Sequence, residues 1–477
     1  MPLAIEALPT TTDYDSVEDP PGSIDPLGTL TYAERLADIL LPGFTARMWR
    51  ARLLTVAAIG ARVGDRVVSL MGNREDVRLE ARLAFERLLV SAVMWAAERD
   101  AAEYKNARRG LPGSSLARRA LAADEPLTRS NFLKGQAVNG PYGVVARLAK
   151  HVGLVEEGGG LAREAATLVV AWSEDQGLPG ILDEEGSERA GYIWLRDVAK
   201  AVAACLGNRD WPGPGSRIWE WLASRLRLDQ IGSQERRVLA RLLETGEIRP
   251  RVLGLLRGST LIQTYRERRR TDGRGGSERA VLVRMRDELT SDHLDRVIDL
   301  SISVIEAYEA MAAVFQQAFD TLLWGLKREG GQAVAATLLA RPRVARQLQR
   351  THTSLGRAIG PLERSIERMR NEPTLAGPEL LEPIERVSEE ARLAAASPQS
   401  MAEEVMRRHE RVQKDKRKNV WIDRDRVWIL MPGFGIEGED PPEYAGAYLH
   451  PFRISNAYSF LADLGRVSLA ISDGEEE

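Results

Sequence analysis

Hydrophobic residues recur at three- and four-residue steps along residues 287–329, the spacing that places them on one face of an α-helix. The same spacing returns in residues 343–370, where Gly360-Pro361 predicts a kink, and in residues 380–412. Long helices joined by short turns usually pack antiparallel, so residues 285–413 are expected to form a helical bundle or coiled-coil arm. Such an arm suits binding to a protein partner, although an internal core explains the pattern equally well.

Helical periodicity also covers the N-terminal part of the chain, residues 27–110. Thr31 stands three residues before Glu34, which is the spacing of a capping box at the start of a helix. Pro42-Gly43 ends this first helix, and further helices are predicted over residues 44–61 and 76–108.

Residues 111–175 combine predicted helices with glycine turns. One helix is predicted over residues 116–121, and another follows Pro141 and ends at Gly153. Leu154 to Glu157 is short and strand-like, Gly158 to Gly160 is a permissive turn, and an apolar return leads into a helix over residues 164–172. The order helix, turn, helix and two-strand hairpin with a glycine tip resembles the winged-helix DNA-binding fold.

This resemblance implies that residues 141–152 form a recognition helix that enters the major groove of duplex DNA. Glu156 and Glu157 precede the wing tip, however, and their carboxylates repel phosphate. Contact with DNA and contact with another protein therefore both stay open for this module. The side chains expected to project toward DNA are Tyr142, Arg147, Lys150 and His151, with Arg163 after the wing.

A first basic cluster lies in residues 251–290, at the end of a predicted helical domain over residues 176–284. This window holds ten arginines against five acidic residues, a net charge of +5. Arg268 to Arg270 run into residues 271–276, which contain three glycines and are expected to form a flexible loop. Basic side chains on such a loop suit contact with phosphates, but a plain solvated loop explains them too. The arginines expected to contact nucleic acid are Arg266, Arg268, Arg269, Arg270 and Arg274.

A second basic cluster begins in residues 407–418, where seven basic residues stand against two acidic ones, a net charge of +5. Two β-prone runs then flank Asp423-Arg424-Asp425, which predicts a hairpin within a small C-terminal α+β piece, residues 414–477. Contact with phosphate and a plain solvated helix end both explain the charge. The residues expected to contact phosphate are Arg407, Arg408, Arg411, Lys414, Lys416, Arg417, Lys418, Arg424 and Arg426.

Composition limits what the whole chain can do. Its 477 residues are 44% hydrophobic and 28% charged, which suffices for a packed core, and its net charge of −3 excludes a polycation that coats nucleic acid. Cys205 is the one cysteine, so no internal disulfide can form. Because no signal-like or membrane-spanning segment is visible, the chain is expected to be cytoplasmic and without membrane contact. Residues 1–26 are acidic, contain no Lys or Arg, and are expected to be a disordered tail.

Motifs for catalysis or cofactor binding are not found. No two of the five histidines lie within four residues, and no phosphate-binding loop, dinucleotide fingerprint or nucleophile elbow occurs. The nearest trace of a metal-dependent nuclease is Glu103-Tyr104-Lys105, with Asp76 or Glu80 upstream, but it falls in a predicted helix rather than on a core strand. No cofactor and no metal are therefore expected.

The sequence thus predicts a mainly α-helical protein with a winged-helix-like module, a long helical bundle and a small C-terminal α+β piece. Its expected function is non-catalytic binding of DNA, mainly duplex phosphates, as a subunit of a bacterial genome-maintenance or phage-defence complex. The alternative is a helical adaptor that assembles protein partners, or two copies of the chain, through helices 287–413 without touching DNA. A metal-dependent nuclease is a second, weaker alternative.

Overall fold

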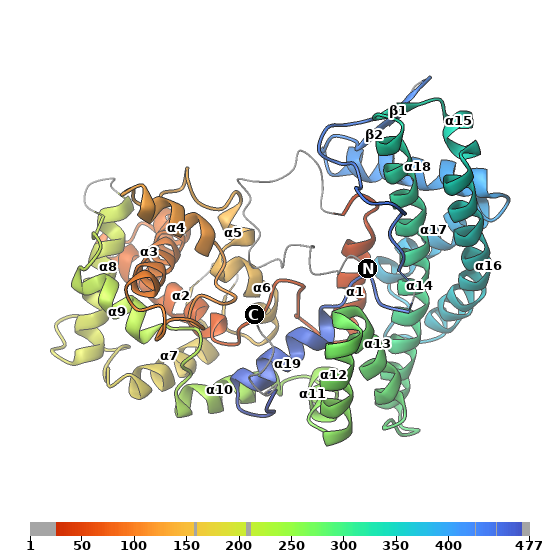
Figure 1. Ribbon diagram of the computed structural model, residues 1–477. Coiled ribbons are helices and arrows are strands. Elements are labelled where there is room, and N and C mark those ends of the chain that lie inside the picture. Colours follow the sequence, from red (N-terminus) through yellow and green to blue (C-terminus); the bar gives the residue numbers. More distant parts are fainter. Residues whose placement is uncertain (1–24, 157–159, 207–210, 425, 445, 470–477) are drawn as a thin grey trace. The chain divides into compact units, whose positions relative to one another are not determined.

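The computed structural model describes residues 25–469, apart from residues 157–159, 207–210, 425 and 445. The chain is mainly helical, which confirms the fold class predicted from the periodicity, and it divides into two compact units (Figure 1). Unit 1 contains residues 25–40 and 258–455, and unit 2 contains residues 41–257 and 456–469. Residues 27–40, which the sequence grouped with the helices that follow them, therefore belong with the second half of the chain.

Four long helices form the centre of unit 1: α14 (His293–Arg328), α16 (Pro342–Arg370), α17 (Pro378–Ala394) and α18 (Pro398–Asp415). α14 and α17 each pack against both α16 and α18, which closes a bundle. α1 (Thr29–Leu40) comes from the N-terminal stretch and packs on α14 and α17. The shorter helices of unit 1 are α12 (Ser259–Thr271), α13 (Gly273–Arg286) and α15 (Ala335–Ala340).

α14 is the 36-residue helix that the longest hydrophobic series predicts. It begins at Asp292, whose side chain accepts a hydrogen bond from the Asp295 amide at 2.9 Å and so satisfies a free N–H of the first turn. Most of its side chains are buried because α1, α16 and α18 cover it from several directions. α14 is therefore the axis around which unit 1 packs.

α16 continues as a helix through Gly360-Pro361, where the sequence predicts a kink, and ends at Arg370. A proline inside a helix removes one backbone hydrogen bond and clashes with the preceding turn. Leu355 and Leu362, on either side of this point, are both fully buried. Packing on both halves of the helix outweighs the local cost of the proline.

A small antiparallel sheet with strand order β1–β3–β2 lies near the C-terminus. β2 (Ile422–Arg424) and β3 (Trp428–Leu430) form the predicted hairpin, with Asp423 opposite Ile429. β1 (Gln332–Ala333) adds an edge strand of two residues that is too short to leave a sequence pattern. The hairpin is fastened by Trp421, whose ring packs against Phe319 of α14 and stacks on Phe434.

α2 (Leu53–Leu70) and α3 (Arg78–Arg99) form the centre of unit 2. Both differ from the predicted ranges: α2 begins nine residues later than residue 44, and α3 ends at Arg99. Asp100 follows α3, and its carboxylate accepts a hydrogen bond from the Glu103 amide at 2.8 Å, a local turn that competes with the helix. The remaining elements of unit 2 are a single 3₁₀ turn (Glu75–Val77), α4 (Ser114–Ala122), α5 (Gln136–Asn139), α6 (Pro141–His151), α7 (Arg163–Asp175), α8 (Ala190–Leu206), α9 (Arg217–Arg225), α10 (Ser233–Leu243), α11 (Ile248–Leu256) and most of α19 (Arg453–Asp463).

The window with the winged-helix pattern contains α4, α5, α6 and α7 in that order. Val155 and Leu161 pair through one antiparallel bridge; Gly158 and Gly159 of the predicted wing tip, and Glu157 before it, lie outside the described residues. These elements are compatible with the resemblance, which stays a prediction.

Candidate functional site

The predicted recognition helix presents only some of its expected side chains to solvent. Lys150 and His151 of α6 are exposed, as are Arg147 and Arg163. Tyr142 is half-buried, because the Arg82 guanidinium of α3 lies over its ring at 3.2 Å from the centroid. Tyr142 is therefore less accessible than the other expected contact residues of this module, and its role in binding stays a prediction.

A buried glutamate of α3 holds the start of α6. Glu86 accepts hydrogen bonds from the Tyr142 amide at 3.0 Å and from the Gln136 side chain at 3.0 Å. Burial raises the pKa of Glu86 to about 7, although the Gln136 hydrogen bond and Arg82 oppose that rise. Gly140 completes this junction, because a Cβ there would lie 2.7 Å from a Glu86 carboxylate oxygen. The start of α6, the helix expected to face DNA, is thus held in place by buried contacts with Glu86 of α3.

The first basic cluster is helical rather than a flexible loop. α12 runs to Thr271 and α13 begins at Gly273, so Arg268 to Arg270 lie in the last turn of α12, where cations stabilise the helix dipole. Arg270 is exposed and forms no ion pair with a described residue. Five arginines of this window are paired with carboxylates: Arg257 with Glu244 (3.5 Å), Arg268 with Asp272 (3.1 Å), Arg279 with Glu306 (3.9 Å), Arg284 with Asp287 (2.7 Å) and Arg286 with Asp299 (2.8 Å).

The second basic cluster is more strongly neutralised. Arg408, which was expected to face nucleic acid, is buried between the Glu390 carboxylate and the Leu27 carbonyl. Its neighbours also use carboxylates of the same chain: Arg411 pairs with Glu390, Arg407 with Glu404, Lys416 with Asp25 and Arg424 with Glu410. The expectation that Arg408 contacts phosphate is therefore wrong. Lys414, Arg417, Lys418 and Arg426 remain exposed and without an ion pair to a described residue.

The nuclease-like residues are also engaged elsewhere. Glu103 lies in a turn after α3 and pairs with the Arg227 guanidinium at 2.6 Å. Asp76 pairs with Arg74, and Glu80 pairs with Arg129 at 3.2 Å. Because Glu103 is on no strand, the arrangement that the nuclease hypothesis requires is absent from this described region.

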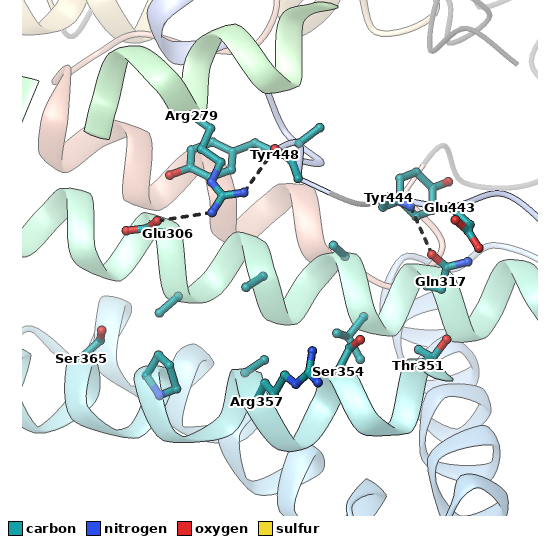
Figure 2. Close-up of a pocket in the computed structure, with 18 of the residues that line it drawn as sticks. Arg279, Glu306, Gln317, Thr351, Ser354, Arg357, Ser365, Glu443, Tyr444 and Tyr448 are labelled. Carbon is teal, nitrogen blue, oxygen red and sulfur yellow. Dashed lines mark hydrogen bonds and ion pairs between the residues drawn. The ribbon is translucent and has the colours of Figure 1, made fainter. Parts of the chain in front are cut away.

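A cavity of about 840 Å³ lies between α14 and α16 in unit 1 (Figure 2). Small residues line both helical walls, with Ala307, Ala310 and Ala313 on α14 and Ser354 and Ala358 on α16. Small side chains leave room for a ligand to approach both helices closely. We refer to this cavity as the α14–α16 groove.

Arginines repeat every seven residues along the α16 wall of the groove, at Arg343, Arg350, Arg357 and Arg364. A step of seven residues is nearly two helical turns, so the four side chains form a row on one face with a rise of about 10.5 Å per step. Arg350, Arg357 and Arg364 line the cavity itself, together with Arg368 and with Arg279 of α13. We refer to the repeated residues Arg343, Arg350, Arg357 and Arg364 as the arginine row.

Residues 439–443 of the same chain form an acidic segment that pairs with half of the arginine row. Arg343 lies 3.7 Å from Asp440 and donates a hydrogen bond to the Glu439 carbonyl at 2.8 Å, and Arg350 lies 3.8 Å from Glu443. Arg357 and Arg364 are exposed and form no ion pair with any residue that the structure describes. Figure 2 shows Arg357 extending from α16 into the space between the two helices.

The acidic segment leaves α16 because the next residue, Tyr444, forms hydrogen bonds with α14. The Tyr444 hydroxyl donates a hydrogen bond to Asp320 at 2.6 Å, and the Tyr444 amide donates one to Gln317 at 3.2 Å. Burial raises the pKa of Asp320 to about 6, although the Tyr444 hydroxyl opposes that rise. Farther along, Arg279 donates to the Gly446 carbonyl and the Tyr448 amide donates to the Gly275 carbonyl. After Glu443 the chain therefore follows α14 and α13, and does not pair with the rest of the arginine row on α16.

A buried ionic network anchors the chain beyond the groove. Arg453 is fully buried and donates hydrogen bonds to Glu278 of α13 at 2.7 Å and to Glu309 of α14 at 3.0 Å. His450 lies 3.2 Å from Glu309 and 3.2 Å from the Thr29 hydroxyl of α1. Burial raises the pKa of Glu278 to about 7; burial would also raise that of Glu309, but His450 and Arg453 outweigh it and lower the pKa to about 2. We refer to Arg453, Glu278, Glu309 and His450 as the buried network.

The sequence alone predicted neither the α14–α16 groove nor the buried network. The seven-residue arginine repeat was visible in the sequence, and so were the alanines at three-residue steps in α14. Neither signal shows that the two faces meet. Glu278 and Arg453 are separated by 175 positions, and no local pattern links them.

No protein family, curated protein or solved structure matches this chain. Within the described ranges, no group of three or more His, Cys, Asp or Glu side chains is placed to hold a metal ion. Among the same residues, no helix is both long enough and apolar enough to cross a membrane.

Proposed function

We propose that this protein is a non-catalytic helical adaptor that holds an anionic segment of a partner in the α14–α16 groove. The observation that carries this proposal is the unequal arginine row: its first half is neutralised by the chain itself, whereas Arg357 and Arg364 face an open cavity. Guanidinium groups bind carboxylate and phosphate with directed, charge-assisted hydrogen bonds. Two such groups beside a cavity with small walls suit recognition of a negatively charged chain.

Affinity capture from the native host tests the adaptor function. We expect the wild-type protein to retain a partner that the double variant Arg357→Glu, Arg364→Glu loses, because the reversed charges repel an anionic segment. The matched control is Arg346→Glu, Arg386→Glu, which makes the same charge change at exposed arginines outside the groove. Equal capture by all three proteins, read by mass spectrometry, would contradict the proposal.

Binding of duplex DNA is a second candidate, and it is the function that the sequence favours, with the same genome-maintenance or phage-defence setting. The exposed cations at the end of α18 support it, since Lys414, Arg417 and Lys418 have no described carboxylate partner. We expect the triple alanine variant of these residues to weaken salt-dependent duplex binding and to reduce its salt slope by about two to three. A binding isotherm that is identical for the variant and the wild type would exclude this surface.

A further inference from the structure

The acidic segment of the chain itself displays how the arginine row binds a ligand. Asp440 meets Arg343 and Glu443 meets Arg350, and these contacts involve the side chains of an irregular, non-helical segment. The two acidic residues are three positions apart, whereas the two arginines are seven positions apart. One step along the row therefore corresponds to three residues of the bound segment.

The two spacings agree physically. Seven residues of α-helix rise about 10.5 Å, and three residues of extended chain span about 10 Å. An extended peptide that lies along α16 can thus keep an acidic residue opposite each arginine without stretching. The agreement holds for the next two positions of the row because the same helix continues through Arg357 and Arg364.

The chain's own segment does not fill those positions. After Glu443 it turns onto α14 through Tyr444 and then onto α13 through Tyr448. Arg357 and Arg364 line the groove among Ser354, Ala358 and Pro361, and the acidic segment does not pair with them. The vacant half of the row therefore has the same repeat as the occupied half.

The walls of the groove favour a peptide over a nucleic acid. Single strands usually bind by stacking their bases on exposed aromatic rings. The two aromatic residues among the lining residues are Tyr444, whose hydroxyl is bonded to Asp320, and Tyr448, which is buried. The other lining residues are mainly small or polar, with five arginines against two glutamates, Glu306 and Glu443, both of which pair with arginines of the chain.

We propose that the open half of the α14–α16 groove binds an extended acidic segment of a partner protein, with Asp or Glu residues three positions apart opposite Arg357 and Arg364. This inference rests on the proposed adaptor function and names the chemistry of its ligand. The bound segment runs in the same direction as residues 440–443 run along α16.

Fluorescence anisotropy with the full-length protein tests this proposal. The probe is a labelled Gly/Ser peptide with glutamate at every third position, compared with an isomer that carries the same glutamates in one block. We expect the spaced peptide to bind about fivefold or more tighter than the block peptide. We also expect Arg357→Ala, Arg364→Ala to weaken it by about fivefold or more, whereas Arg346→Ala, Arg386→Ala leaves it unchanged.

Three results would overturn the inference. These are equal affinity for the two peptides, equal affinity of the groove variant and its control, and groove-dependent binding of an oligo-dT strand in place of the peptide. If partner capture from the host still depends on Arg357 and Arg364 while the spaced peptide has no advantage, the adaptor function stands and the three-residue spacing fails. If capture is also independent of these arginines, both proposals fail.

Discussion

Replacing Arg453 with alanine is expected to lower the free energy of unfolding by about 3–5 kcal/mol, because the change leaves two buried carboxylates without their cation. Arg453, Glu278 and Glu309 are all at most 1% exposed, so water cannot take the place of the guanidinium. Arg453 also donates a hydrogen bond to the His450 carbonyl at 2.8 Å, which the variant loses. Urea unfolding followed by circular dichroism measures the change.

The loss should depend on pH in a defined direction. Burial already raises the folded-state pKa of Glu278, and loss of Arg453 raises it further, so protonation of Glu278 stabilises the fold at low pH and this stability is lost as pH rises through the folded value. The variant is therefore expected to lose less stability at pH 5 than at pH 8. Arg386→Ala, at an exposed position of α17, is the control and should change stability by no more than about 0.5 kcal/mol. A loss below about 1 kcal/mol for Arg453→Ala would show that the network is not a stabilising anchor.

Replacing Arg52 with alanine is expected to destabilise unit 2 by a similar amount, about 3–5 kcal/mol. Arg52 and Glu235 are completely buried and pair at 3.0 Å. The same guanidinium donates hydrogen bonds to the carbonyls of Arg225 and Arg227, and so ties the start of α2 to the end of α9. Its removal leaves the buried Glu235 carboxylate without its cation and takes one donor from each of the two carbonyls.

Arg52→Lys separates charge from geometry in this contact. Lysine keeps the positive charge but cannot reach three acceptors with a planar fork, so we expect it to recover only part of the lost stability. Limited proteolysis of unit 2 in mild denaturant reports on the same change by a second method. Full recovery with lysine would mean that charge alone, and not the carbonyl contacts, holds the two helices.

The helices were predictable because burial on one face leaves a period in the sequence. The series from Leu289 to Leu326 predicts α14 closely, since each turn contributes to a core that covers the whole helix. The end of α3 was predicted less accurately, because one local contact decides where the helix stops. The Asp100 side chain forms a turn with the Glu103 amide and so ends the helical region there. The prediction also missed β1, because two residues form no pattern.

The sequence overestimated the free positive charge of residues 407–418 for a different reason. A net charge counted along the chain includes only the acidic residues that are nearby in sequence. Lys416 is neutralised by Asp25, 391 positions away, and Arg408 by Glu390, 18 positions away on another helix. The groove was missed for the same reason, since the wall on α14 and the row on α16 face each other only in the folded bundle.

Unit 1 consists of two segments that are far apart along the chain, and this affects the order in which the protein folds during translation. α1 ends at Leu40, but Tyr308, whose hydroxyl donates a hydrogen bond to the Thr29 carbonyl at 2.7 Å, is made only after all of residues 41–257. At about 5–20 residues per second, the apolar side of α1 waits roughly 13–54 s for that contact, and longer for His450. During translation, residues 41–257 therefore emerge before α1 can meet α14, and unit 2 in turn lacks residues 456–469 until the end of synthesis.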